Sequence, residues 1–577
     1  MISSYQKTEC LTGSTQRRQI LCGVMFCGML ILLGKAISLQ VLEKDFLKRQ
    51  GDIRHIVDVN VSAYRGKIVD RNGEPLAIST PVKSVWVNPK QVSDVASQHI
   101  TGLENLLKLP QGKFTKIIEK NTDKHFVYLK RHVSPAVAAQ VKALKITGVH
   151  LDREFKRFYP SGEITGHLLG FTDIDDIGQE GLELAFDNVL RGVPGKKRVM
   201  RDGKKNVIAD IEEISSPIPG RDLQISIDSR LQYLAYRELK AAVKSHQASS
   251  GSLVMLDAKT GEVLAVVNQP SFNPNDRGDL QGYRYRNRAM TDVFEPGSTV
   301  KPFLIASALD GGYVSANDVV DTSPGYYRIG RNVVRDFRNY GVLGLTDILK
   351  KSSNVAVSKI ANEMPAEAMW GFYNRLGMGQ SAGVGFPGEA SGTLIDYQYM
   401  DDFEQATLSF GYGVSMSVIQ LARAYTALAD DGLLHSVTLL KRDYDQDSQR
   451  VFTPKTASNI RAMLEHVVEK DGTAYKARVA GYSVAGKTGT VKKIINGRYS
   501  KEQYLSLFVG IIPAQDPRLV MAVLIDEPTA GDYYGGAVAG PVFSKVMSRS
   551  MRILGVDPSF QQDQKKPLVL ASQGYKP

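Results

Sequence analysis

A serine and a lysine three residues apart place the tightest constraint on how this chain can fold. Ser298 and Lys301 lie just before an apolar run at residues 303–309, which predicts a helix. Residues at i and i+3 share a helix face, so the hydroxyl and the amine can approach each other. A serine hydroxyl is a poor nucleophile until a base takes its proton, and a lysine is that base only when its pKa falls. The fold must therefore bury Lys301 or place a second cation beside it.

Two further motifs follow along the chain. The pattern S-x-N lies at residues 352–354, and the pattern K-T-G-T lies at residues 487–490. Their order and wide spacing predict three separate walls of one cleft, of which S-x-x-K is the first. Another Lys-Thr-Gly, at residues 259–261, lies between two apolar runs, so we expect a hairpin turn there.

With this motif set the chain resembles a class B penicillin-binding protein. It is most similar to the division-specific septal D,D-transpeptidase (penicillin-binding protein 3) group of Gram-negative bacteria. The resemblance runs from the apolar N-terminal segment to about Val556. It also rests on N-terminal motifs at residues 65–77, 153–160 and 178–183, and on motifs of the catalytic half at residues 409–413 and 533–536.

The resemblance implies a mixed α+β or α/β architecture. An N-terminal transmembrane helix and an elongated mixed pedestal precede a serine penicillin-recognising fold, an antiparallel sheet flanked by helices with an all-helical lobe. The expected domains are a cytoplasmic tail (1–18), a transmembrane signal anchor (19–42), a pedestal (43–225), a transpeptidase domain (226–556) and a disordered tail (557–577). Strands are predicted as a hairpin at residues 252–268 and singly at 482–485, 507–511 and 519–525.

A long apolar segment lies near the N-terminus. Residues 20–34 are apolar or small, and residues 36–42 extend the run past Lys35. About 20 such residues span a hydrocarbon core. No A-x-A-like cleavage site follows, which favours an uncleaved signal anchor over a cleaved signal peptide. Arg17 and Arg18 favour a cytoplasmic N-terminus, although basic residues also follow the segment.

Composition excludes several classes of function. The chain has 72 Lys and Arg against 60 Asp and Glu, a net charge of +12. Because the basic residues are scattered and form no platform with aromatic residues, we expect no nucleic-acid binding. A surface facing anionic lipid or acidic cell-wall polymer fits this charge, and so does a merely basic soluble surface. The cationic segment 195–205 is interpreted as a solvated hairpin, or alternatively as a contact surface for glycan or a partner protein.

Cysteine and histidine usage argues against metal and triad chemistry. The three cysteines all lie at or before Cys27, so the main body has no disulfide framework and no cysteine metal cluster. The nine histidines lie outside every motif and do not cluster. We therefore expect neither a Ser-His-Asp hydrolase nor a zinc site, and we expect no cofactor.

The resemblance implies an acyl-transfer role for four residues. Ser298 attacks the penultimate D-Ala carbonyl of a D-Ala-D-Ala stem peptide, with Lys301 as the general base. Ser352 relays the proton to the leaving D-Ala amine, and Asn354 orients Lys301 and the substrate amide. An amine from a second stem peptide then resolves the acyl-enzyme into a crosslink. A β-lactam mimics the donor and stalls at the acyl stage.

The same resemblance implies how the donor is bound. Lys487 makes the site positive for the terminal carboxylate, which the hydroxyls of Thr488 and Thr490 bind. Gly489 leaves a strand edge on which the peptide can extend. The backbone N–H groups of Ser298 and Thr490 form the oxyanion hole. Further cleft residues are Ser353, Tyr412 and either Tyr533 or Tyr534, whereas Glu295 is interpreted as structural.

The favoured interpretation is a transpeptidase of the division septum, anchored in the inner membrane with its catalytic domain in the periplasm. Alternatives to it remain open. A D,D-carboxypeptidase or β-lactamase would use the same acyl-enzyme, but the E-x-x-L-N pattern of class A lactamases is absent. A β-lactam sensor would keep the motifs without turnover. Val418 stands where the division group carries proline, which leaves a specialised paralogue open. Because no glycosyltransferase module is present, the resemblance implies a SEDS-family glycosyltransferase and other division proteins as partners.

Overall fold

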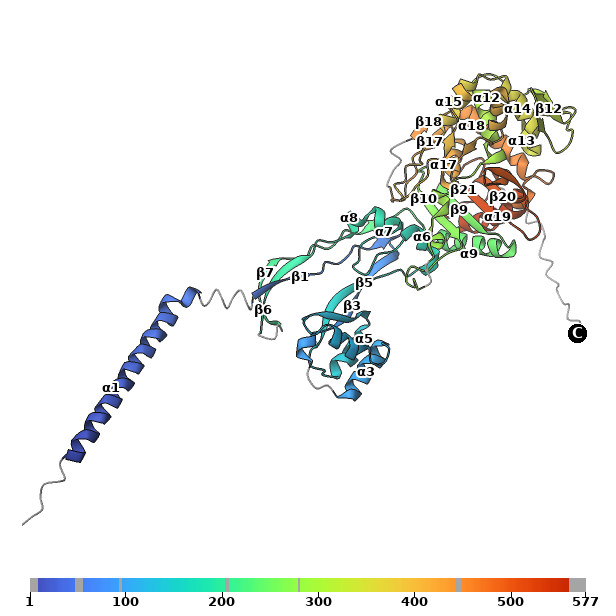
Figure 1. Ribbon diagram of the computed structural model, residues 1–577. Coiled ribbons are helices and arrows are strands. Elements are labelled where there is room, and N and C mark those ends of the chain that lie inside the picture. Colours follow the sequence, from blue (N-terminus) through green and yellow to red (C-terminus); the bar gives the residue numbers. More distant parts are fainter. Residues whose placement is uncertain are drawn as a thin grey trace, which may run out of the picture. The chain divides into compact units, whose positions relative to one another are not determined.

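The computed structural model describes residues 9–46, 56–92, 96–202, 207–278, 281–442 and 448–559 (Figure 1). The chain divides into two compact units. The first comprises Met1–Tyr64, Lys83–Glu154 and Gly192–Pro219, and the second comprises Arg65–Val82, Phe155–Arg191 and Gly220–Pro577. Three segments of the predicted pedestal, residues 65–82, 155–191 and 220–225, thus belong to the second unit. The predicted domain boundaries stay predictions, and the predicted disordered tail lies outside the described residues from residue 560 onward.

The N-terminal segment is helical, as its apolar run predicts. Helix α1 (Glu9–Ile37) continues as a π-helical turn over Ser38–Leu42. The 26 residues Arg17–Leu42 are predominantly apolar and unburied. By length and composition, this helix can cross a membrane.

The first unit contains a three-stranded antiparallel sheet in the order β1-β6-β7. Its strands are β1 (Ile56–Val61), β6 (Gly195–Arg201) and β7 (Val207–Ser215). The cationic segment therefore forms a hairpin, whose tip lies outside the described residues. Arg198 in β6 pairs with Asp58 at 2.9 Å and with Glu212 at 3.1 Å, so neighbouring carboxylates offset part of its charge.

The same unit has a small helical core against strand β4. Val85, Leu103 and Phe114 are among its fully buried side chains. Ser134 caps α5 by accepting a hydrogen bond from the N–H of Val137, as the Ser-Pro sequence predicts. The elements are α3 (Ser97–Leu107), α4 (Lys113–Lys120), β4 (Val127–Val133) and α5 (Pro135–Ala143).

Within the second unit, the N-terminal motifs form a buried charge cluster. Glu183 is fully buried and accepts hydrogen bonds from Arg65 at 2.8 Å and Arg157 at 2.6 Å. Arg65 also reaches Asp187 at 2.6 Å, and Arg157 donates to the carbonyl of Gly66. Three segments far apart in the sequence are thereby joined. The motifs at residues 65–77, 153–160 and 178–183 thus contribute to structure.

A five-stranded antiparallel sheet forms the centre of the second unit, in the order β10-β9-β21-β20-β19. Its strands are β9 (Ser250–Asp257), β10 (Val263–Gln269), β19 (Ala485–Ile495), β20 (Arg498–Ile512) and β21 (Leu519–Asp526). Residues 259–261 form the predicted hairpin turn between β9 and β10. β19 is an edge strand, with β20 as its one strand partner among the described residues.

One strand prediction is wrong in position. A strand was expected at residues 482–485, but β19 starts at Ala485 and contains the whole K-T-G-T motif. Residues 483 and 484 lie in no strand, and Tyr482 makes only an isolated bridge to Val479. Pairing with β20 holds β19 extended, although its glycines and lysines hide the apolar alternation that marks a strand.

Helices cover both faces of this sheet. Figure 1 shows α9 and α19 on one side of the sheet, and α17 with the other helices of the C-terminal half on the opposite side. The long helices are α9 (Ser229–Ser245), α12 (Lys301–Asp310), α14 (Asn354–Asn362), α15 (Ala366–Arg375), α17 (Val418–Ala429), α18 (Pro454–Glu465) and α19 (Gly535–Ile553). The shorter helices are α6 (Gly166–Leu169), α7 (Gly181–Ala185), α8 (Asp187–Leu190), α10 (Gly282–Tyr285), α11 (Arg288–Thr291), α13 (Leu345–Lys351) and α16 (Asp402–Leu408). This arrangement confirms the predicted mixed fold, with its helix-flanked antiparallel sheet.

Short strands complete the chain. They are β2 (Ile68–Val69), β8 (Leu223–Gln224), β11 (Val319–Asp321), β12 (Tyr326–Ile329), β13 (Asn332–Arg335), β14 (Val342–Gly344), β15 (Thr393–Leu394), β16 (Val414–Ser415), β17 (Leu433–His435) and β18 (Ser448–Arg450), with the longer β3 (Pro75–Val87) and β5 (Val149–Phe158). Residues 336–351 connect the β12–β13 hairpin to S-x-N and include β14 and α13.

Candidate active site

Ser298 lies on a tight turn that leads into a buried helix. Residues Gly297–Val300 form a 3-10 turn, and α12 begins at Lys301. Ser298 is half-buried, whereas Lys301 is fully buried. Gly297 has φ of +54°, and a Cβ there would lie 2.4 Å from a methyl group of Val491. Glycine at 297 thus lets the turn approach β19 closely.

The amine of Lys301 is held by the S-x-N segment. Its Nζ donates to Asn354 Oδ1 and to the carbonyl of Ser352, both at 2.6 Å, and lies 3.3 Å from Ser352 Oγ. Among the described residues, no hydrogen bond joins the Ser298 hydroxyl to Lys301. The amine is therefore fixed one helical turn after Ser298 by groups from another segment.

Ser352 brings the two lysines of the motifs together. Its φ of +60° is left-handed, and it ends α13. Its hydroxyl accepts a hydrogen bond from Lys487 Nζ at 2.9 Å, in addition to its contact with Lys301. The predicted convergence of S-x-x-K, S-x-N and K-T-G-T on one place is thus what the structure shows.

Burial changes the charge state of both lysines. Burial of Lys301, together with the nearby positive charge of Lys487, lowers its pKa well below the usual value, and the negative charge of Asp336 opposes this shift. Burial lowers the pKa of Lys487 to about 7. A neutral amine at Lys301 is therefore accessible near neutral pH.

The rest of K-T-G-T lines the same edge of the sheet. The Thr488 hydroxyl donates to Thr473 Oγ1 at 3.1 Å, and Thr490 Oγ1 accepts from the N–H of Gly535 at 3.0 Å. A Cβ on Gly489 would lie 3.1 Å from the Thr299 methyl group. Because Gly489 has no side chain on the side of the nucleophile turn, β19 can lie against that turn.

The loop at residues 409–413 packs directly on the nucleophile turn. The N–H of Gly297 donates to the carbonyl of Gly411 at 3.3 Å, and a Cβ on Gly411 would lie 2.2 Å from Gly297 O. Glu295 accepts from the N–H of Gly413 at 3.1 Å and from the Tyr499 hydroxyl at 3.2 Å. Burial raises the pKa of Glu295. Its ties to two other segments fit the structural interpretation of this residue.

Aromatic side chains flank these segments. The ring of Tyr412 packs edge-on against Tyr499 at 5.5 Å between centroids. Tyr533 stacks between Tyr504 and Tyr534, at 4.2 and 4.5 Å. Sequence reasoning named Tyr412, Tyr533 and Tyr534 but missed Tyr499 and Tyr504, whose positions follow from the pairing of β19 with β20.

Ser353 makes hydrogen bonds to two other parts of the protein. Its side chain is fully buried, and it caps α14 by accepting from the N–H of Ala356 at 3.0 Å. Its hydroxyl also donates to Asp336 Oδ2 at 2.5 Å. The Ser353 hydroxyl thus donates one hydrogen bond and accepts another within the protein, and its contact with substrate stays a prediction. Asp336 lies in no motif, and nothing in the sequence points to it.

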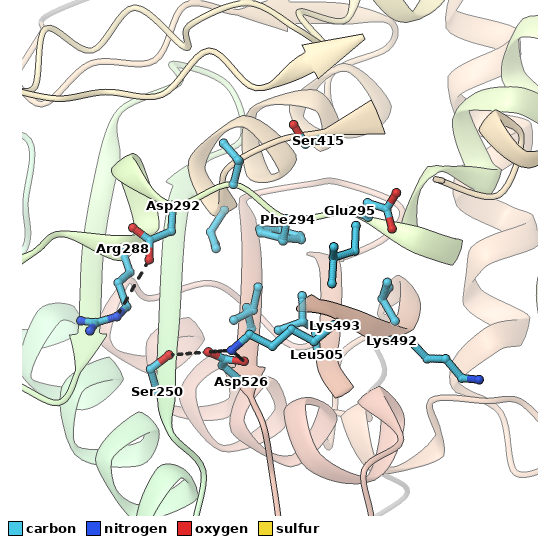
Figure 2. Close-up of a pocket in the computed structure, with 15 residues that line it drawn as sticks. Ser250, Arg288, Asp292, Phe294, Glu295, Ser415, Lys492, Lys493, Leu505 and Asp526 are labelled. Carbon is cyan, nitrogen blue, oxygen red and sulfur yellow. Dashed lines mark hydrogen bonds and ion pairs between the residues drawn. The ribbon is translucent and has the colours of Figure 1, made fainter. Parts of the chain in front are cut away.

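A separate cavity lies beside the nucleophile segment (Figure 2). Its volume is about 370 Å³, and Phe294 and Val418 are among its lining residues. Figure 2 shows Lys493 and Ser250 meeting at Asp526, while Arg288 meets Asp292. Val418, the position that departs from the resembled group, lies at the first turn of α17 and faces this cavity. Within the described ranges, no three His, Cys, Asp or Glu side chains gather in a metal-binding arrangement.

Comparison with known proteins gives the same picture. Residues 251–548 match the family model of the penicillin binding protein transpeptidase domain, and residues 60–225 match that of the penicillin-binding protein dimerisation domain. The probable peptidoglycan D,D-transpeptidase PenA of Neisseria meningitidis serogroup A is 42% identical over 552 residues, covering 95% of this chain and 93% of PenA. The peptidoglycan D,D-transpeptidase FtsI of Escherichia coli K12 is 42% identical over 547 residues, covering 94% of this chain and 92% of FtsI.

A solved structure is similar over the C-terminal part. The transpeptidase domain of Burkholderia pseudomallei penicillin-binding protein 3 has 44% identity and a TM-score of 0.54, covering 58% of this chain and 98% of that one. The motifs, the sheet and these matches agree over most of the sequence. The chain therefore belongs to the penicillin-binding protein transpeptidase family and carries both the transpeptidase and the dimerisation domain.

Proposed function

We propose that this chain is a membrane-anchored peptidoglycan D,D-transpeptidase that crosslinks stem peptides at the division septum through a serine acyl-enzyme. The observation that carries the proposal is the buried amine of Lys301, held by Asn354 and Ser352 one helical turn after Ser298. The relatives named FtsI and PenA, matched over most of the chain, support the same reaction.

Acylation begins with attack on the donor. Ser298 Oγ bonds to the carbonyl carbon of the penultimate D-Ala, and its proton passes to the neutral amine of Lys301. The tetrahedral intermediate then collapses, and the bond to the terminal D-Ala nitrogen breaks. Ser352 hands its hydroxyl proton to that nitrogen and takes in its place the proton held by Lys301, since its hydroxyl contacts both Lys301 and Lys487. Lys301 is then neutral again. Terminal D-Ala leaves as the free amino acid.

Donor binding uses the K-T-G-T strand. The positive charge of Lys487 attracts the terminal carboxylate, and the Thr490 hydroxyl donates to it. The Thr488 hydroxyl also donates to it after turning away from Thr473 Oγ1. The free edge of β19 beside Gly489 accepts the peptide as an added strand. The N–H groups of Ser298 and Thr490 stabilise the oxyanion, at about 3 kcal/mol per donor. Tyr412 lines the cleft on the opposite side.

The acyl-enzyme is resolved by an amine. The amine of a second stem peptide attacks the Ser298 ester carbonyl, loses a proton to Lys301, and forms the crosslinking amide as the serine regains its proton. A β-lactam acylates Ser298 in the same way, but its opened ring stays attached and the enzyme stalls.

The anchor and the partners extend the proposal. The apolar helix at Arg17–Leu42 crosses the inner membrane once, with Arg17 and Arg18 on the cytoplasmic side. The chain after Leu42 then lies in the periplasm, where stem peptides are found. A SEDS-family glycosyltransferase supplies the glycan strands, as the resemblance to class B penicillin-binding proteins implies, and other division proteins bind alongside it.

One experiment separates this function from its alternatives. The purified full-length protein is mixed with a D-Ala-D-Ala donor and an amine acceptor, and the products are identified by mass spectrometry. A transpeptidase gives the donor–acceptor amide, a carboxypeptidase gives only the hydrolysed donor, and a sensor gives a stable acyl-protein without turnover. Hydrolysed donor alone, at every acceptor concentration, would refute the proposal. Scoring cell shape after gene knockout distinguishes the main division enzyme from a specialised paralogue.

A further inference from the structure

Asp336 lies between strands β13 and β14 and contacts the start of α14 from outside that helix. Its Oδ1 accepts from the N–H of Asn354 at 2.5 Å and of Val355 at 3.0 Å, and its Oδ2 accepts from the Ser353 hydroxyl at 2.5 Å. The first N–H groups of a helix have no partner within the helix. With Ser353 bonding Ala356, the first three N–H groups of α14 are all satisfied.

The neighbour of Asp336 holds the other end of Asn354. The Asn354 side-chain amide donates to the carbonyl of Arg335 at 3.2 Å. The backbone and the side chain of Asn354 are thus both tied to the end of the β12–β13 hairpin. The remaining polar atom of the Asn354 side chain is Oδ1, which accepts a hydrogen bond from Lys301 Nζ at 2.6 Å. The chain of contacts runs from Asp336 through Asn354 to the amine.

We propose that Asp336 is a positioning residue for acyl transfer: its carboxylate fixes the start of α14 so that Asn354 holds the Lys301 amine ready for the Ser298 proton. The inference rests on the proposed function. Asp336 does not touch the substrate in this account and acts only through Asn354 and Ser353. A displacement of about 1 Å at a reacting group can slow a reaction by about 100-fold, so the positioning matters for rate.

The negative charge of Asp336 predicts an effect on the pH dependence of acylation that helix capping alone would not produce. The charged groups acting on Lys301 are Lys487 from β19 and Asp336 from the segment after β13. Asp336 raises the pKa of Lys301, against burial and Lys487, so loss of its charge lowers that pKa further. Without the Asp336 charge, the Lys301 amine is therefore still neutral at a more acidic pH. The acid limb, which is the fall in acylation rate on the acid side of the pH profile, moves to lower pH.

The test measures the rate of covalent labelling by a fluorescent penicillin against pH, in the full-length protein, with thermal unfolding in parallel. Asp336→Asn is expected to lower the plateau rate by about 10-fold or more and to shift the acid limb to lower pH. Ser353→Ala removes the helix cap but keeps the carboxylate, so its acid limb stays in place. Asp321→Asn replaces an exposed carboxylate that is hydrogen-bonded to Ser323; it is the matched control and behaves as wild type.

Two results with Asp336→Asn would each overturn the inference. One is a wild-type rate and acid limb in Asp336→Asn. The other is a slower Asp336→Asn with an unmoved limb and the same loss of thermal stability as Ser353→Ala, which would reduce Asp336 to a helix cap. If Asp336→Asn does not fold, Asp336→Glu keeps the charge but displaces it, and a wild-type plateau there would equally overturn it. Absence of labelling in the wild type would instead refute the proposed function.

Discussion

Lys487 Nζ donates a hydrogen bond of 2.9 Å to Ser352 Oγ, although 135 residues separate the two in sequence. The edge strand β19 and the end of α13 therefore meet at one hydroxyl. Lys301 reaches the same hydroxyl from a third element, α12. Two buried amines so close together cannot both carry a proton at low cost, because like charges in a buried site repel. This relationship makes one of them available as a base.

The two lysines predict a pH profile with two limbs. Acylation needs Lys301 neutral, so the rate falls at low pH. Binding of the donor carboxylate needs Lys487 charged, and burial lowers the pKa of Lys487 to about 7. Because an ammonium is present only below its pKa, the rate of penicillin labelling should also fall as the pH rises above about 7.

Lys487→Arg tests the assignment of the basic limb. A guanidinium has a pKa above about 12 and keeps its charge across this range. The variant is expected to react more slowly, because the planar guanidinium differs in shape from the lysine ammonium. Its labelling rate should no longer fall as the pH rises above about 7. If both proteins show the same decline above pH 7, Lys487 is not the group that titrates there.

Gly411 and Gly413 offer a matched pair beside the nucleophile turn. Both have left-handed φ values, +86° and +77°, so alanine strains the backbone similarly at either position. A Cβ on Gly411 would lie 2.2 Å from Gly297 O, whereas a Cβ on Gly413 has no atom within 4 Å. Gly411→Ala should therefore slow penicillin labelling by about 10-fold or more, because the turn carrying Ser298 must move.

Gly413→Ala is the control, and it should label close to the wild-type rate at a similar loss of thermal stability. Equal rates in the two variants would show that the approach of Gly411 to Gly297 does not position the nucleophile. The measurement is the second-order rate constant of labelling, with unfolding midpoints recorded alongside.

The buried charge cluster predicts a large effect on stability far from the chemistry. Glu183→Gln leaves Arg65 and Arg157 short of an anion in a site that excludes water, which should cost about 3–5 kcal/mol of the free energy of unfolding. Glu212→Gln, in the exposed pair with Arg198, should leave the unfolding midpoint unchanged. Urea unfolding followed by circular dichroism checks both, and a Glu183→Gln midpoint equal to wild type would contradict the structural reading of the N-terminal motifs.

The sequence predicted the parts of the site that have a local signature. Ser298, Lys301, Ser352 and Lys487 stand in short motifs whose order along the chain matches their convergence, and the hairpin at residues 259–261 was recognised from its apolar flanks. β19 was placed too early because its pairing with β20, not its own pattern, makes it a strand. Asp336 was missed because its contacts with α14 arise only when the β12–β13 hairpin folds against that helix. The capping role of Ser353 was missed because a capping serine looks no different in sequence from one that contacts substrate.

The most direct test of the central claim is peptide mapping by mass spectrometry after reaction of the full-length protein with penicillin. The account predicts one penicilloyl adduct, on the peptide that contains Ser298, and no adduct in a folded Ser298→Ala variant. An adduct of undiminished stoichiometry in Ser298→Ala would contradict it, because another residue would then be the nucleophile.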